Sequence, residues 1–146
     1  ALKKHSPAMR KFDDVAGGRE AVFAAREGAE DRAEEGEAIA RQLRERDLLI
    51  AISASSVTPF ARGALAGART RGLRAVLLTC ASDEGVGPLA DLVIALDTGA
   101  EVLTGSTRLK AGSATKAALN AITTAAMIRL GKVYENFMVD LKQGSE

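Results

Sequence analysis

The stretch Leu48–Thr79 reads L-L-I-A-I-S-A-S-S-V-T-P-F-A-R-G-A-L-A-G-A-R-T-R-G-L-R-A-V-L-L-T and decides the fold. Its first apolar run, Leu48–Ser53, suits a strand buried in a parallel sheet. A second run, Ala75–Thr79, has the same character. Between them Pro59 is placed to open a helix, where proline is tolerated, and Gly72 is placed to end it. Strand, helix and strand in this order predict a right-handed parallel βαβ unit.

The alternation continues downstream. Leu92–Leu96 is a third apolar run and predicts another parallel strand. Ala117–Leu130 is apolar nearly all round, which predicts a buried helix covered by its own sheet or by a second subunit. Gly131 is placed to close that helix. The tail Val133–Leu141 is too apolar to be left in water, so we expect it to dock on a neighbour or on a part of the protein that is not in this chain.

Two more helices are predicted upstream. Arg19–Arg26 has helical spacing that lets Val22 and Phe23 face a core. The acid-rich segment Glu27–Glu37 reads as a solvated helix start, where early acids favour the helix dipole. An amphipathic helix follows at Ile39–Arg46. With the three apolar runs, these segments predict an α/β fold: a parallel sheet flanked by helices.

The composition limits the classes of protein. The 146 residues, 47% apolar and 27% charged, fit one soluble domain, which we place at residues 15–141 between a polar arm (1–14) and a polar tail (142–146). A net charge of +1 and no tryptophan argue against nucleic-acid binding, and no apolar run is long enough to cross a membrane. A single cysteine and the lack of an apolar signal core lead us to expect a cytoplasmic protein.

Two polar clusters follow predicted strands. The first is a set of hydroxyls after the first strand: Ser53, Ser55, Ser56 and Thr58. The second, Thr104–Lys116, reads T-G-S-T-R-L-K-A-G-S-A-T-K and joins hydroxyls and cations at a helix start. Such a start can bind phosphate or carboxylate; the plain alternative is a helix cap with solvated lysines. The carboxyl ends of parallel strands share one edge, so we expect both clusters there, which favours the anion site.

These motifs resemble the N-acetylmuramic acid 6-phosphate etherases, which with the glucokinase regulatory proteins belong to the sugar isomerase (SIS) domain superfamily. The second cluster and the following M-I-R-L-G-K-V-Y-E-N-F-M-V-D (Met127–Asp140) carry most of the resemblance. E-G-A-E-D (Glu27–Asp31) and I-S-A-S-S-V-T-P-F (Ile52–Phe60) extend it, so that it covers residues 15–141. It implies a SIS-type three-layer sandwich, usually dimeric, that binds a sugar phosphate at the carboxyl edge of its strands.

The resemblance also implies an activity and site residues. The etherases cleave the lactyl ether of N-acetylmuramic acid 6-phosphate to N-acetylglucosamine 6-phosphate and D-lactate, a reaction for which we expect neither metal nor cofactor. Glu30 matches the base that takes the C2 proton, a role for which it must be desolvated or paired. Ser55 and Thr58 match hydroxyls of the second phosphate loop, to which Ser53 and Ser56 also belong. The residues that match the polar cluster closing over the sugar are Ser106, Arg108 and Lys110.

The sequence departs from the family pattern in two places. The family's first glycine-rich phosphate loop and the helix after it, which carries the second catalytic glutamate, have no counterpart here. The second loop reads Ser55-Ser56-Val57 in place of serine-glycine-arginine. We therefore expect a SIS domain incomplete at its N-terminal side, with one of two catalytic carboxylates, that forms a homodimer or associates with a chain carrying the missing half.

Two alternatives to an etherase-like lyase stay open. The changed loop and the missing acid favour a non-catalytic sugar-phosphate-binding protein, in the manner of the glucokinase regulatory proteins. An aldose–ketose isomerase of the same fold would also need a C2 base such as Glu30. The tail pattern at Met127–Asp140 argues against the isomerase, because it resembles the etherase branch.

Overall fold

The computed structural model describes residues 14–81 and 87–139. Almost all of the polar arm, the whole polar tail and Leu141 lie outside these residues. The described chain forms two units, one ending at Thr115 and one starting at Lys116.

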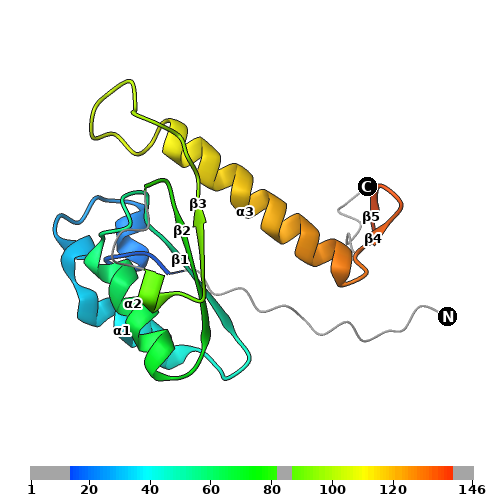
Figure 1. Cartoon of the computed structure of the whole chain (residues 1–146), viewed down its shortest axis with the longest axis horizontal. Coiled ribbons are helices and arrows are strands. Elements are labelled where there is room, and N and C mark those ends of the chain that lie inside the picture. Colours follow the sequence, from blue (N-terminus) through cyan, green and yellow to red (C-terminus); the bar gives the residue numbers. More distant parts are fainter. Residues whose placement is uncertain (1–13, 82–86, 140–146) are drawn as a thin grey trace. The chain divides into compact units, whose positions relative to one another are not determined.

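The larger unit is built on three parallel strands in the order β1-β2-β3 (Figure 1). They are β1 (Leu48–Ile52), β2 (Arg74–Thr79) and β3 (Leu92–Ala95). The central residues of the three strands are aligned: Ala51 of β1 pairs with Leu77 of β2, and Leu77 pairs with Val93 of β3. All three predicted strands, and the parallel sheet, are confirmed.

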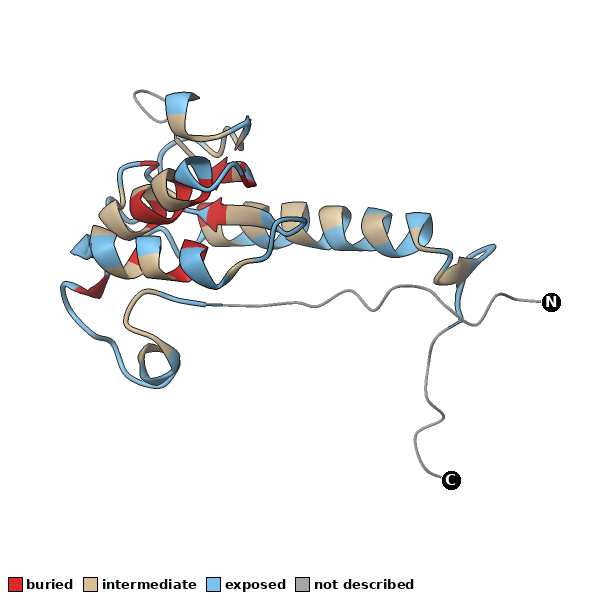
Figure 2. Cartoon of the chain, turned by 90° about the horizontal axis from the view of Figure 1, so that it is seen from below, coloured by how far each residue is buried: buried red, intermediate tan, exposed pale blue. Residues whose placement is uncertain are grey.

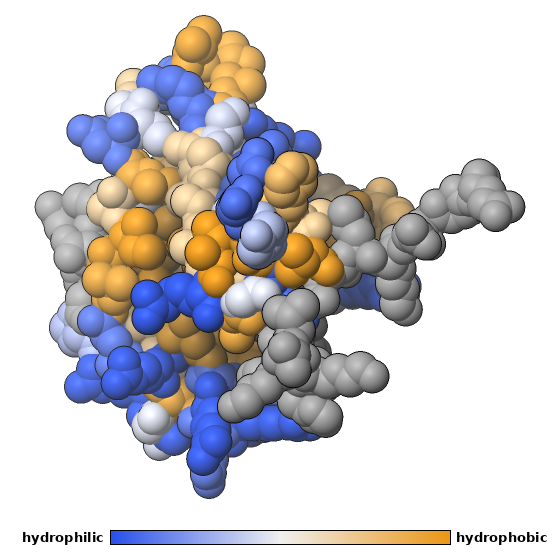
Figure 3. Space-filling model, turned by 90° about the vertical axis from the view of Figure 1, so that its right-hand side faces the viewer, coloured by the Kyte–Doolittle hydropathy of each residue, from blue (hydrophilic) through white to orange (hydrophobic). Residues whose placement is uncertain are grey.

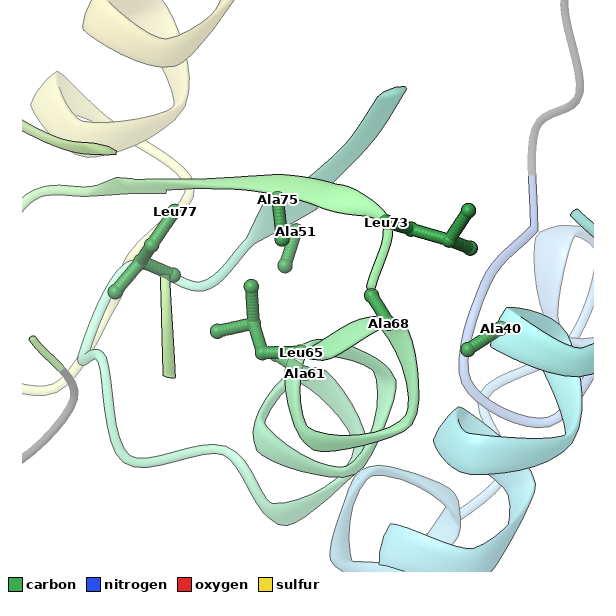
Figure 4. Packing of buried hydrophobic residues seen from close by; sticks show 8 residues of the cluster. All are labelled: Ala40, Ala51, Ala61, Leu65, Ala68, Leu73, Ala75 and Leu77. Carbon is green, nitrogen blue, oxygen red and sulfur yellow. The ribbon is translucent and has the colours of Figure 1, made fainter. Parts of the chain in front are cut away.

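Helices α1 (Ala33–Gln42) and α2 (Pro59–Thr70) lie on one side of this sheet (Figure 1). α2 begins at the predicted proline, and Gly72, with φ of 67°, follows its end. Buried residues gather where α2 meets the strands (Figure 2). The core that joins these elements is small and rich in alanine (Figure 4): Ala40, Ala51, Ala61, Leu65, Ala68, Leu73, Ala75 and Leu77.

Two glycines let α1 and α2 approach closely. A β-carbon on Gly36 would overlap the Phe60 carbonyl oxygen, and one on Gly63 would overlap the Ala33 carbonyl oxygen. Side chains are therefore excluded from this contact. Gly63 meets Ala33 at the start of α1, and Gly67 meets Ala40 farther along, so the two helices run in the same general direction with their starts side by side.

The upstream predictions need correction. The predicted helix Arg19–Arg26 is only a short 3-10 turn, η1 (Arg19–Val22), and it follows two glycines with positive φ. Val22 and Phe23 do not face a core, since they are 65% and 86% exposed. A second 3-10 turn, η2 (Ala29–Asp31), precedes α1.

α1 also ends earlier than predicted. It stops at Gln42 instead of continuing to Arg46. The backbone N–H of Arg44 donates to Asp47 Oδ2 at 2.8 Å, which forms a turn before β1. A third 3-10 turn, η3 (Gly87–Leu89), precedes β3.

The longest helix, α3 (Lys110–Arg129), starts inside the polar cluster and not at Ala117 as predicted. Ala111 is the one residue of α3 that is buried, and the predicted cover of this helix, by its own sheet or by a second subunit, stays a prediction. Gly131, with φ of 72°, follows its end as predicted. A small antiparallel hairpin comes next, made of β4 (Val133–Tyr134) and β5 (Phe137–Met138).

Large apolar side chains remain at the surface (Figure 3). Leu48 and Ile52 on β1 are 52% and 48% exposed, although strands of a parallel sheet are normally covered on both faces. Tyr134 and Phe137 of the hairpin are exposed as well. Across residues 14–81 and 87–139, no helix has the length and apolar character needed to span a membrane.

Candidate functional site

Hydrogen bonds join the carboxyl ends of the three strands. The Cys80 N–H, after β2, donates to the Ala54 carbonyl, after β1, at 3.2 Å. The Leu96 N–H, after β3, donates to the Thr79 carbonyl at 2.8 Å. The segments that leave these strands therefore start from one continuous edge.

The first polar cluster forms the loop from β1 to α2. The hydroxyls of Ser53 and Thr58 lie 2.7 Å apart and close the loop. Ser53 and Ser56 are buried, at 5% and 4% exposure, while Ser55 is exposed. Ser56 has φ of 62°, a left-handed conformation that favours glycine. This position is the one where the resembling family has glycine.

The start of α2 opens onto this loop. Thr58 is the N-cap residue, but its side chain makes no capping hydrogen bond, because its hydroxyl pairs with Ser53. The backbone N–H of Arg62 donates to the carbonyl of this N-cap residue, Thr58, at 3.1 Å. Helix starts of this kind attract anions through the dipole and the early N–H groups.

The start of α3 is different, because a carboxylate already caps it. Glu101 Oε2 accepts the Lys110 N–H at 3.1 Å, and Oε1 accepts the Ala111 N–H at 2.9 Å. These two bonds, the Ala111 bond foremost, and the nearby Lys110 charge lower the pKa of Glu101 below its ordinary value, although partial burial opposes them. A helix cap was the plain alternative to an anion site here, but Glu101 was not predicted to supply it. The preference of helix starts for acidic side chains was the signal that could have found it.

The three predicted ligands from the second cluster lie around this capped start. Ser106 is half-buried, and its N–H donates to the Leu103 carbonyl at 3.0 Å in a turn. Arg108 and Lys110 are exposed. Cys80 Sγ lies 3.6 Å from the Ala111 carbonyl and 3.7 Å from Thr115 Oγ1, which ties the first turns of α3 to the end of β2. Both polar clusters therefore border the same edge, as predicted.

Glu30 lies in η2, which packs against α2. η2 comes just before α1, whose start lies beside the start of α2, so Glu30 is at the same end of the domain as the Ser53–Thr58 loop. The side chain is exposed. The burial or charged partner that a base requires is not provided by residues 14–81 and 87–139.

Other kinds of site find little support. Among the described residues, no cluster of three or more His, Cys, Asp or Glu side chains is arranged to hold a metal ion. Two surface hollows lie at the opposite edge of the sheet, before the strands begin. One is lined by residues 44–47 and Arg71, the other by residues including Arg69, Arg74 and Asp91. Neither hollow includes a residue of the polar clusters.

Comparisons with known proteins agree with the motifs. Residues 2–69 match the sequence profile of the glucokinase regulatory protein N-terminal SIS domain. An N-acetylmuramic acid 6-phosphate etherase of Symbiobacterium thermophilum is 50% identical over 133 residues, which are 90% of this chain and 44% of that enzyme. An etherase of Oceanobacillus iheyensis is 48% identical over 88% of this chain and 44% of its own length.

A third relative, N-acetylmuramic acid 6-phosphate etherase 2 of Vibrio cholerae, is 47% identical over 88% of this chain and 42% of its own length. Among solved structures, the Vibrio vulnificus NanR protein complexed with ManNAc-6P matches with a TM-score of 0.43 and 19% identity, over 68% of this chain and 44% of that one.

The chain thus spans less than half the length of the curated relatives that it matches. Its parallel sheet and flanking helices agree with part of a SIS fold. The resemblance read from the motifs is confirmed: the chain is similar to the N-acetylmuramic acid 6-phosphate etherases over nearly its whole length, and its fold is consistent with part of a SIS domain.

Proposed function

We propose that this chain forms the sugar-phosphate-binding part of an etherase-like carbon–oxygen lyase. Its reaction is the cleavage of N-acetylmuramic acid 6-phosphate to N-acetylglucosamine 6-phosphate and D-lactate. The observation that carries the proposal is the start of α2, which Thr58 leaves uncapped beside a loop of hydroxyls. The names of the similar proteins supply the substrate class.

In this proposal the phosphate binds at the start of α2. Ser55 is exposed and Thr58 half-buried, so both hydroxyls are within reach of a ligand. The buried pair Ser53 and Ser56 shapes the loop behind them. Ser106, Arg108 and Lys110 approach from the neighbouring loop and contact the sugar. Glu101 already caps α3, which supports placing the phosphate at α2.

The proposed chemistry starts from the open-chain sugar, in which the C1 aldehyde acidifies the C2 proton. Glu30 takes that proton, the C3–O bond breaks, and the lactyl oxygen leaves with a proton from an acid. Water then adds across the C2=C3 bond. Glu30 is exposed in this chain, so the burial that suits it to the task comes from a part of the enzyme beyond residues 14–81 and 87–139. The acid comes from there as well.

Lactate release from N-acetylmuramic acid 6-phosphate tests the proposal. The full-length protein should release lactate, and Glu30→Gln should abolish release without changing the melting temperature. Glu34→Gln is the matched control, since Glu34 is another exposed acid near a helix start and should not matter. A folded full-length protein that releases no lactate would rule the proposal out.

A second candidate is a non-catalytic sugar-phosphate sensor. Ser56 and Val57 favour it, because they stand where the resembling family has glycine and arginine, and Val57 is 57% exposed and uncharged. It predicts that N-acetylglucosamine 6-phosphate raises the melting temperature without turnover. Restoring the family residues with Ser56→Gly and Val57→Arg should then tighten binding. Lactate release by the unaltered full-length protein would exclude this candidate.

We further propose that the exposed apolar surfaces are covered in the working protein. In this proposal the remainder of the domain covers Leu48 and Ile52 on β1. A neighbouring subunit of a dimer covers the exposed side chains of the hairpin. Light scattering on the full-length protein should give the mass of a dimer. A monomer would contradict the dimer but not the ligand site.

A further inference from the structure

The segment between β3 and α3 returns on itself. Gly99 has φ of 61°, and a β-carbon added there would lie 3.8 Å from Lys110 Nζ. Glu101, two residues further on, accepts the backbone N–H of Lys110, so the two ends of segment 99–110 lie close together. Compact surface loops with adjoining ends frequently carry function.

Glu101 closes the base of this loop. Each of its carboxylate oxygens accepts one backbone N–H from the first turn of α3, at 3.1 Å from Lys110 and 2.9 Å from Ala111. Ala111 is 3% exposed, and its carbonyl contacts Cys80 at the end of β2. The loop base is thus fixed both to a helix and to the strand edge.

The rest of the loop has little support from the described chain. Val102 and Leu103 are 87% and 65% exposed. Arg108 is exposed and has no ion pair with an acid among residues 14–81 and 87–139. The geometry of the loop therefore depends on its base.

We propose that Glu101 is a positioning residue for the ligand site: it holds loop 102–109 so that Ser106 and Arg108 stay at the edge that carries the Ser53–Thr58 loop. The inference rests on the function proposed above and adds a residue to it. Glu101 itself does not touch the ligand, because both of its oxygens are bonded to α3.

A cap that serves stability alone would behave differently. Its removal would lower the melting temperature but would not change the affinity of the folded protein. A positioning residue changes affinity measured at a temperature where every variant is folded. The two roles are therefore separated by comparing affinity with stability.

The test uses calorimetric titration of the full-length protein with N-acetylglucosamine 6-phosphate. Glu101→Gln keeps the size of the side chain but replaces one accepting oxygen with a donor, and it should weaken binding about tenfold. Ile39→Val is the control for stability, because it trims a buried side chain in α1, away from the loop. Glu34→Gln is the control for charge. Both controls should bind like the unaltered protein.

If Glu101→Gln binds N-acetylglucosamine 6-phosphate with an affinity within about twofold of that of the unaltered protein, the inference is overturned. If the unaltered protein binds no sugar phosphate, the proposed function fails, and hydrogen exchange decides the inference separately. Faster exchange of loop amides 102–109 in Glu101→Gln than in Ile39→Val supports the positioning role. Equal exchange in the two variants overturns it.

Discussion

The hydroxyls of Ser53 and Thr58 lie 2.7 Å apart and span the loop between β1 and α2. Ser53 is 5% exposed, so this hydrogen bond is shielded from water. It also occupies the Thr58 hydroxyl, which would otherwise be placed to cap α2. One side-chain pair thus closes the loop and keeps the Thr58 hydroxyl from capping α2.

Removing one partner of this pair should cost stability. Ser53→Ala leaves the Thr58 hydroxyl without its partner, and we expect a loss of about 1 kcal/mol in the free energy of unfolding. Ser55→Ala is the matched control, since Ser55 is exposed, and should stay within about 0.5 kcal/mol of the unaltered protein. Urea denaturation measures both. Equal stability of the two variants would show that the pair does not hold the loop.

Ser56 should tolerate glycine and reject a β-branched residue. Its φ of 62° is costly for any residue with a β-carbon, and most costly for a branched one. We expect Ser56→Val to lower the free energy of unfolding by at least about 2 kcal/mol. Ser56→Gly should change it by less than about 1 kcal/mol, because the released strain offsets the lost contacts and the greater freedom of the unfolded chain. Similar losses in the two variants would contradict a strained backbone.

The elements predicted correctly are those whose bounds are marked by specific residues in the sequence. β1, β2 and β3 are continuous apolar runs, and α2 lies between Pro59 and Gly72, so each end has its own chemical cause. The errors fall where the signal was apolar spacing alone. Val22 and Phe23 have the apolar spacing of a helix that faces a core, yet both are exposed in the described part of the chain. Apolar residues at helical spacing indicate that a surface will be covered, but they do not identify the segment or chain that covers it.

The position of the candidate site could be predicted from the sequence, but its hydrogen bonds could not. Strand order places the Ser53–Thr58 loop and the start of α3 at one edge, and this follows from the rules of parallel sheets. The hydrogen bonds within the site do not follow from the sequence. Glu101 caps α3 across a loop, and the turn that brings it there depends on Gly99, with φ of 61°.

Gly63 should be among the residues least tolerant of change. A β-carbon there would overlap the Ala33 carbonyl, so Gly63→Ala must push α1 away from α2. We expect a loss of at least about 2 kcal/mol in the free energy of unfolding. Gly112→Ala is the control, because its β-carbon would meet only the Thr107 carbonyl at an ordinary 3.5 Å. That change should be neutral or stabilise α3 by up to about 1 kcal/mol. A mild effect of Gly63→Ala would mean that the helices are not in contact.

Glu101 should make stability depend on pH in the acid range. The N–H groups of Ala111 and Lys110 and the Lys110 charge lower its pKa in the folded chain below the ordinary 4.5. The unfolded chain therefore binds the proton more readily, so the stability from this carboxylate is present above the ordinary pKa and is lost as pH falls through the lower folded value. Urea midpoints between about pH 7 and about pH 3 should fall more steeply for the unaltered protein than for Glu101→Gln. The other acids are shared by both proteins and cancel in the difference, so parallel curves would mean that Glu101 does not cap α3 in solution.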